Sequence, residues 1–164
     1  MIADAHVIYE RYARDVHRFV LYLSGDPALA DDITAEAFVR LWTAPGEIRT
    51  STVKSYLFTI ARNLYLTGQR RVRRETDLDE VTLPAASPSP ESRAIARDEA
   101  RHVFNAIGRL PEIDRTALLL HAREQMPYQE IASILGLSVT AVKVKVHRAR
   151  VRLLAWRTTP EPQS

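Results

Sequence analysis

The chain has no cysteine among its 164 residues, and this absence excludes three kinds of chemistry. It cannot form a disulfide, bind a metal through thiolates or attack a substrate with a cysteine nucleophile. A chain of this composition suits a reducing compartment, so we expect a cytoplasmic protein.

Long apolar runs are missing too. No stretch of about eighteen apolar residues occurs, and the segment MIADAHVIYERYARDVHRF lacks the basic start and apolar run of an export signal. The sequence therefore predicts neither contact with a membrane nor export.

The residues of an active site are not gathered anywhere in the sequence. The five histidines, at positions 6, 17, 102, 121 and 147, do not have the spacing of metal ligands. No nucleophile stands with a base, and no carboxylates cluster as a nuclease or recombinase would require. We expect no metal, no cofactor and no enzymatic activity.

What the sequence does have is charge segregated into blocks. Residues 53–74 and 138–159 each contain six basic and no acidic residues, whereas 75–92 contain five acidic and no basic ones. The acidic block also contains three prolines and little periodic apolar content, which predicts a flexible linker. We therefore expect two domains, 1–74 and 93–158, joined by a linker at 75–92.

Apolar residues recur at helical spacing through both domains, which predicts an all-α protein. In the first domain one helix ends at the GDP of 25–27, a second runs from about Ala28 to Thr43, and a third runs from Val53 to about Arg74. The side chains expected to face inward are Tyr9, Tyr12, Val16, Phe19, Val20, Leu23, Ile33, Ala37, Phe38, Leu41, Trp42, Leu57, Phe58, Ile60, Ala61, Leu64 and Tyr65.

The second domain begins with an apolar stripe that includes Val103, Phe104 and Ile107, and it ends with a helix-turn-helix pattern. A short helix opens at Pro127 and Tyr128 and stops at Gly136, and Ser138 is expected to cap a longer helix that reaches about Arg157.

In a helix-turn-helix motif the second helix lies in the major groove of DNA. Helical spacing turns one set of apolar residues inward: Val139, Val142, Val146, Ala149 and Leu153. The residues left outward to read base edges are Thr140, Lys143, Val144, His147 and Arg148, and those expected to contact phosphate are Lys145, Arg150 and Arg152. A helical hairpin with a solvated basic face would have the same pattern, so the motif alone leaves both interpretations open.

Four segments, in order, resemble one protein family. They are ALADDITAEAFVRLW at 28–42, VKSYLFTIARNLYLTGQRRVRR at 53–74, RLPEIDRTALLL at 109–120 and MPYQEIASILGLSVTAVKVKVHRARVRL at 126–153. Together they resemble the extracytoplasmic-function sigma factors, the small sigma subunits of bacterial RNA polymerase. The resemblance implies a protein that binds core polymerase and directs initiation from promoters with minus-ten and minus-thirty-five elements.

For the first domain the resemblance implies two surfaces. Acidic residues of the second helix, Asp31, Asp32 and Glu36, would contact the clamp helices of the largest polymerase subunit. Ala35 departs from the pattern here, because relatives often carry Gln. The third helix, with the loop at 44–52, would recognise and melt the minus-ten element. Its expected DNA contacts are Lys54, Tyr56, Arg62 and Asn63, with phosphate contacts from Arg70, Arg71, Arg73 and Arg74. Tyr56 could stack on an unpaired base or pack against the first helix, and the sequence does not decide between these roles.

For the second domain the resemblance implies recognition of the minus-thirty-five duplex by the last helix. Val144 departs from the family's pattern, because many relatives carry Ser there, and an apolar side chain could contact a thymine methyl group. His147 could bond to a base edge or to the backbone. Members of the family are commonly held inactive by an anti-sigma protein. The competing interpretation is a helix-turn-helix regulator that binds duplex DNA without polymerase.

Overall fold

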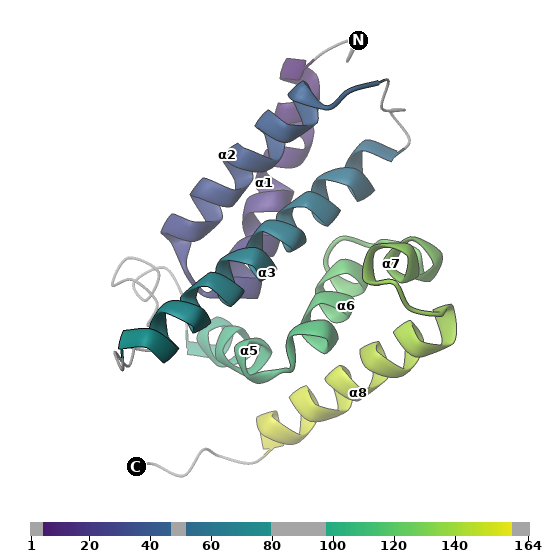
Figure 1. The fold of residues 1–164 in the computed structure, drawn as a ribbon. Helices are drawn as coiled ribbons and strands as arrows, with labels where there is room; N and C mark the ends of the chain where they lie inside the picture. The colour runs from purple at the N-terminus through teal and green to yellow at the C-terminus, as the bar shows by residue number, and fades with distance from the viewer. Residues whose placement is uncertain (1–4, 47–51, 80–97, 159–164) are drawn as a thin grey trace. The chain divides into compact units, whose positions relative to one another are not determined.

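The computed structural model describes residues 5–46, 52–79 and 98–158, and the elements in these ranges are all α-helices. The chain divides into two compact units, Met1–Ser89 and Pro90–Ser164. Figure 1 shows the helices of each unit. The predicted all-α architecture with two helical domains is confirmed. Within these ranges, no helix has both the length and the apolar character needed to cross a membrane.

Three helices build the first unit: α1 (Ala5–Ser24), α2 (Pro27–Thr43) and α3 (Val53–Asp79), and each contacts the other two. The core lies where their apolar stripes meet, as the helical spacing predicted. The rings of Phe19 and Phe58 meet edge to face there, with centroids 5.1 Å apart. The buried side chains include Val16, Phe19, Val20, Leu23, Ala30, Ile33, Thr34, Ala37, Phe38, Leu41, Val53, Leu57, Phe58, Ala61 and Tyr65.

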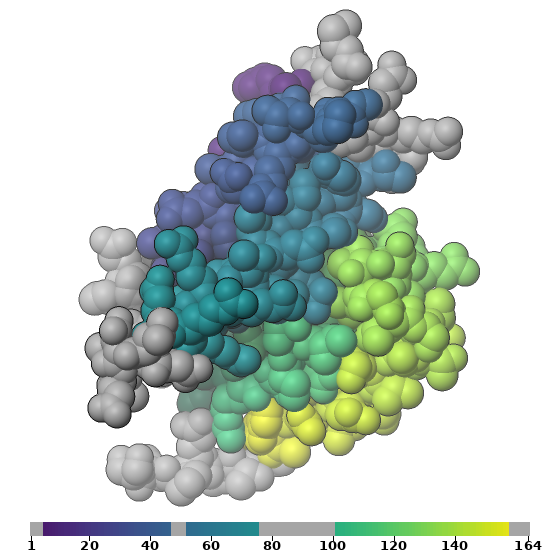
Figure 2. Space-filling model, viewed as in Figure 1, coloured from purple at the N-terminus to yellow at the C-terminus, as the bar shows by residue number. Residues whose placement is uncertain are grey.

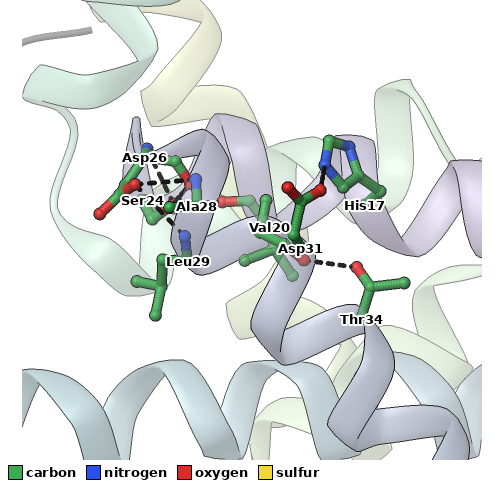
Figure 3. A network of polar contacts seen from close by, with 9 residues as sticks. His17, Val20, Ser24, Asp26, Ala28, Leu29, Asp31 and Thr34 are labelled. Carbon is green, nitrogen blue, oxygen red and sulfur yellow. Dashed lines mark hydrogen bonds and ion pairs between the residues drawn. The ribbon is translucent and has the colours of Figure 1, made fainter. Parts of the chain in front are cut away.

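The junction between α1 and α2 is short and held by side chains (Figure 3). Gly25 has a φ of 71°, which reverses the chain after α1. The Asp26 carboxylate accepts hydrogen bonds from the backbone N–H groups of Ala28 and Leu29, at 3.0 and 3.2 Å, and so caps α2. Pro27 follows at the first helical position, which has no use for an N–H group. The GDP sequence thus ends one helix and begins the next.

The third helix is longer than predicted. It was expected to end near Arg74, but α3 continues to Asp79, so residues 75–79 are helical and do not belong to an unstructured linker. The acidic composition of this segment does not prevent helix formation, because these residues only extend a helix that is already nucleated. Residues 80–92 of the expected linker lie outside the described residues.

The second unit contains α5 (Asp98–Arg109), α6 (Glu112–Ala122), α7 (Tyr128–Leu135) and α8 (Val139–Thr158). The last helix contacts the other three and closes the core of the unit. Apolar side chains from all four elements are buried here, among them Ile107, Leu120, Ile131 and Val146. The carboxyl-terminal end of α8 is held to α5 by Arg109, whose guanidinium carbon lies 4.5 Å from the centre of the Trp156 ring.

Three side chains that were expected in a core are exposed. Trp42 is 44% exposed and Tyr9 46% exposed, near one end of the first unit, and Val103 is 53% exposed on α5. Each has the correct helical spacing, but no element in the described part of the chain covers it fully. The prediction that these residues are buried was wrong.

Candidate nucleic-acid interface

The turn between α7 and α8 is built as the helix-turn-helix pattern predicted. Gly136 ends α7 in the left-handed conformation, with a φ of 66°, and the N–H of Leu137 donates to the Ala132 carbonyl at 3.0 Å. The Ser138 hydroxyl accepts the N–H of Ala141 at 3.1 Å and caps α8. These local bonds fix the direction in which α8 leaves the turn.

One side of α8 is buried and the opposite side is open. Val142, Val146 and Ala149 are fully or almost fully buried against the unit. The five residues predicted to read bases are all exposed, and they occupy the amino-terminal half of the helix: Thr140, Lys143, Val144, His147 and Arg148. In Figure 2 this helix is drawn in light green to yellow. An α-helix fits the major groove of DNA, and the exposed side of this one carries basic side chains.

Lys143 does not project alone from this surface. Its ammonium nitrogen lies 5.7 Å from the centre of the Tyr128 ring, at the start of α7. The Tyr128 ring in turn stacks on His121 of α6, with centroids 4.4 Å apart and planes inclined by 12°. The stack therefore links α6 and α7 to Lys143 of α8, a residue that was predicted to contact bases. The sequence did not reveal it, because its members lie on different elements.

Two of the residues predicted to contact phosphate have an internal partner. The Lys145 nitrogen lies 3.4 Å from one carboxylate oxygen of Asp114, and the Arg152 guanidinium lies 4.0 Å from the other. Asp114 is in the first turn of α6 and is 1% exposed. Lys145 and Arg152 thus lie beside the core stripe of α8, and this arrangement does not support a phosphate contact for Lys145. Arg150 is exposed, as a phosphate contact requires.

The third helix carries the second basic surface. Near its carboxyl-terminal end the side chains of Arg70, Arg71, Arg73 and Arg74 are exposed, and Arg71 pairs with Glu75 at 3.4 Å. Four cations within five residues project around the helix and concentrate positive potential there. Figure 2 shows part of this surface in teal.

The residues predicted to bind an opened strand lie nearer the start of α3. Asn63 is exposed, whereas Tyr56, Lys54 and Arg62 are half-buried. Tyr56 and Asn63 are seven residues apart and share a face of the helix. A half-buried Tyr56 fits both stacking on a base and packing within the unit. Residues 47–51 of the preceding loop lie outside the described residues.

The acidic face of α2 is partly engaged within the unit. Asp31 lies 2.8 Å from His17 of α1, and Glu36 pairs with Arg40 one turn along at 3.1 Å. The first of these pairs is drawn in Figure 3. Asp32 is exposed. All three carboxylates can still be approached from solvent, as a contact with a basic partner needs.

An aromatic group that the sequence analysis assigned to the core lies at the end of α2. The rings of Tyr9 and Trp42 are 6.4 Å apart, and both contact Phe38, at 5.0 and 5.8 Å. Val39 beside them is 48% exposed. The sequence does contain a signal of this exposed apolar group. Val39 and Trp42 are three residues apart and therefore lie next to each other on one side of α2.

Comparison with known proteins gives matches over both units. Residues 8–75 match the family model of sigma-70 region 2, and residues 103–153 match that of sigma-70, region 4. The chain is 30% identical to the ECF RNA polymerase sigma factor SigM of Bacillus subtilis, over 90% of this chain and 91% of that protein. It is 31% identical to the ECF sigma factor SigE of Mycolicibacterium smegmatis, over 89% of this chain and 58% of that longer protein.

A solved structure is similar in fold. The sigma factor RpoE of Bartonella quintana, crystallised with the anti-sigma factor NepR, matches 98% of this chain with a TM-score of 0.82 and 23% identity.

Proposed function

The chain belongs to the extracytoplasmic-function sigma factors, and we propose from its surfaces how it binds core RNA polymerase and promoter DNA. As a sigma factor it directs promoter-specific transcription initiation. We place region 2 in residues 1–74 and region 4 in residues 93–158. The protein would work in the cytoplasm, with the catalysis supplied by the polymerase.

The upstream promoter element would be read by α8. The proposal depends most on one observation, the five exposed side chains on one side of its amino-terminal half. Lys143 and Arg148 have the donors to bind guanine edges, and Val144 can contact a thymine methyl group. Thr140 and His147 complete the surface, and Arg150 would bind phosphate and contribute no sequence information.

The minus-ten element would be opened along α3. Asn63 and Tyr56 would hold an unstacked base, with Lys54 and Arg62 beside them. The four exposed arginines at positions 70, 71, 73 and 74 would attract the strand backbone. This division fits the chemistry, because opened strands need stacking and charge whereas a duplex is read by its edges.

Core polymerase would contact the acidic face of α2. Asp32 and Glu36 offer exposed carboxylates to basic residues of the clamp helices, and Asp31 would contribute through its pair with His17. Trp42 and Val39 add apolar area beside this face, and aromatic residues are frequent anchors of protein interfaces. An anti-sigma protein that covers these surfaces would keep the factor inactive.

In vitro transcription from a randomised promoter library, with purified core polymerase, tests the proposal. The complex should initiate from a defined set of sequences, whereas the free protein should not shift duplex DNA. Lys143→Ala or Arg148→Ala should reduce discrimination between upstream bases by about 1–3 kcal/mol at the position that the residue contacts. Arg157→Ala, an exposed cation outside the proposed contacts, is the matched control. A free protein that selects duplex sequences without polymerase would indicate an ordinary regulator instead.

A further inference from the structure

A buried carboxylate, that of Asp114, lies beside the proposed DNA-binding helix α8. Asp114 is 1% exposed, in the first turn of α6, where a negative charge also suits the helix dipole. A buried carboxylate is costly unless cations or hydrogen bonds compensate it. Within the described residues its Oδ2 accepts no hydrogen bond, so nearby cations are the partners that can compensate this oxygen.

That charge is supplied by α8. Lys145 and Arg152 are seven residues apart, two turns of helix, and so both reach the same side of α6. Their nitrogens lie 3.4 and 4.0 Å from the two carboxylate oxygens. The Lys145 side chain is only 23% exposed, and that of Arg152 is 44% exposed. The pair of Lys145 with Asp114 is therefore both shorter and less exposed than that of Arg152 with Asp114.

These pairs change how many cations of α8 are available to DNA. Each lysine or arginine that neutralises a phosphate releases a counterion and strengthens binding to any sequence alike. A cation that is already compensated by a buried carboxylate contributes little to this term. Sequence preference depends on the ratio of specific to non-specific affinity. With fewer phosphate contacts, the side chains that read bases supply a larger share of the binding free energy.

We propose that Asp114 is a specificity-determining residue, which withdraws Lys145 and Arg152 from the DNA backbone and thereby lowers the sequence-independent affinity of α8. This inference rests on the proposed role of α8 in reading the upstream element. Asp114 acts through the two cations and does not itself contact DNA.

The test uses the full chain bound to core polymerase. Binding is measured at several salt concentrations on a promoter and on the same promoter with its upstream element scrambled. With Asp114→Asn, the slope of log K against log salt should steepen by about 0.9 for each freed cation. Affinity for the scrambled promoter should rise, and the ratio between the two promoters should fall.

Two further variants separate this effect from a change in net charge or in fold. Glu112→Gln removes the same charge from the same turn of α6, while Gln keeps an acceptor for the Thr116 hydroxyl, so the slope should stay that of the wild type. The triple variant Asp114→Asn, Lys145→Gln, Arg152→Gln should restore the wild-type slope. A purely structural role would weaken both promoters together and would not be reversed in this way.

A second comparison leaves Asp114 in place. Lys145→Gln should leave the salt slope unchanged, whereas Arg150→Gln should flatten it by about 0.9. Equal flattening by both variants would overturn the proposal, as would an unchanged slope in a folded Asp114→Asn variant. If the wild-type complex does not distinguish the two promoters at all, then the proposed function of α8 has failed and not this inference.

Discussion

The ammonium group of Lys143 lies 5.7 Å from the centre of the Tyr128 ring, which itself stacks on His121. A cation over an aromatic face is attracted to it and loses rotational freedom. One side chain of α8, the helix that we propose reads the upstream bases, is thus oriented by a residue of α7. If α8 reads DNA as proposed, this contact adds Tyr128 to the recognition surface, although Tyr128 precedes the turn.

Removing the ring beside Lys143 should weaken recognition of the base that Lys143 is proposed to contact. Tyr128→Leu is expected to reduce discrimination at that position about two- to fivefold, since an exposed cation–π contact contributes about 0.5–1 kcal/mol. Competition binding of the polymerase complex with single-base variants of the upstream element measures this. Tyr128→Phe keeps the ring and should retain the preference. Equal losses in both variants would point to the hydroxyl and its contact with His121.

Promoter opening should depend on Asn63 and Tyr56. Asn63→Ala and Tyr56→Ala are expected to reduce the fraction of open complex, with about 1–3 kcal/mol lost where a base stacks on the ring. A fluorescent base analogue in the minus-ten element reports opening directly. Tyr56→Phe keeps the ring and should open the promoter as the wild type does. Normal opening by Tyr56→Ala would leave Tyr56 with a packing role only.

Charge reversal on α2 should weaken binding to core polymerase. Glu36→Lys removes the pair with Arg40 and places two cations one turn apart, at a total cost of about 0.4–1 kcal/mol to the helix. A drop in affinity for the core beyond tenfold would therefore come from the interface. Glu10→Lys, on α1, makes the same charge change and breaks a comparable pair with His6. If both variants bind the core equally well, the proposed acidic contact is wrong.

The turn before α8 should be sensitive to a side chain at Gly136. Gly136→Ala is expected to destabilise the second unit by about 1–2 kcal/mol, because its left-handed backbone disfavours a Cβ even though the surrounding space is open. Gly108→Ala, inside α5 with open space around it, should stabilise by about 0.5–1 kcal/mol. The chain has two tryptophans, so in a Trp42→Phe background the fluorescence of Trp156 follows unfolding of this unit alone. If Gly136→Ala stabilised the unit as Gly108→Ala is expected to, that result would contradict the left-handed conformation at Gly136.

Most of the fold was predictable because helices are encoded locally. Apolar spacing of three and four residues identified Val16, Leu41 and Val146 as core positions, and all are buried. Short signals identified the ends of helices equally well, as with Gly136 and Ser138. These features depend only on residues within one or two turns of each other.

What the sequence could not give depends on contacts between distant residues. Trp42 has core spacing, but whether another element covers it is decided elsewhere in the chain, and none in the described part of the first unit does so fully. Lys145 has the same charge and a similar setting to Arg150, yet only Lys145 has a buried carboxylate beside it. The burial of Asp114 has no local signal either, because it depends on contacts with α8.

Only three residues, Gly136 to Ser138, separate α7 from α8, and the pose of α8 depends on them and on its inward valines. The outward positions Thr140, Val144 and His147 take no part in that support, so they can be randomised while the scaffold is left intact. A library built at these sites should yield folded variants that each initiate from a different promoter. Synthetic gene circuits require such orthogonal switches.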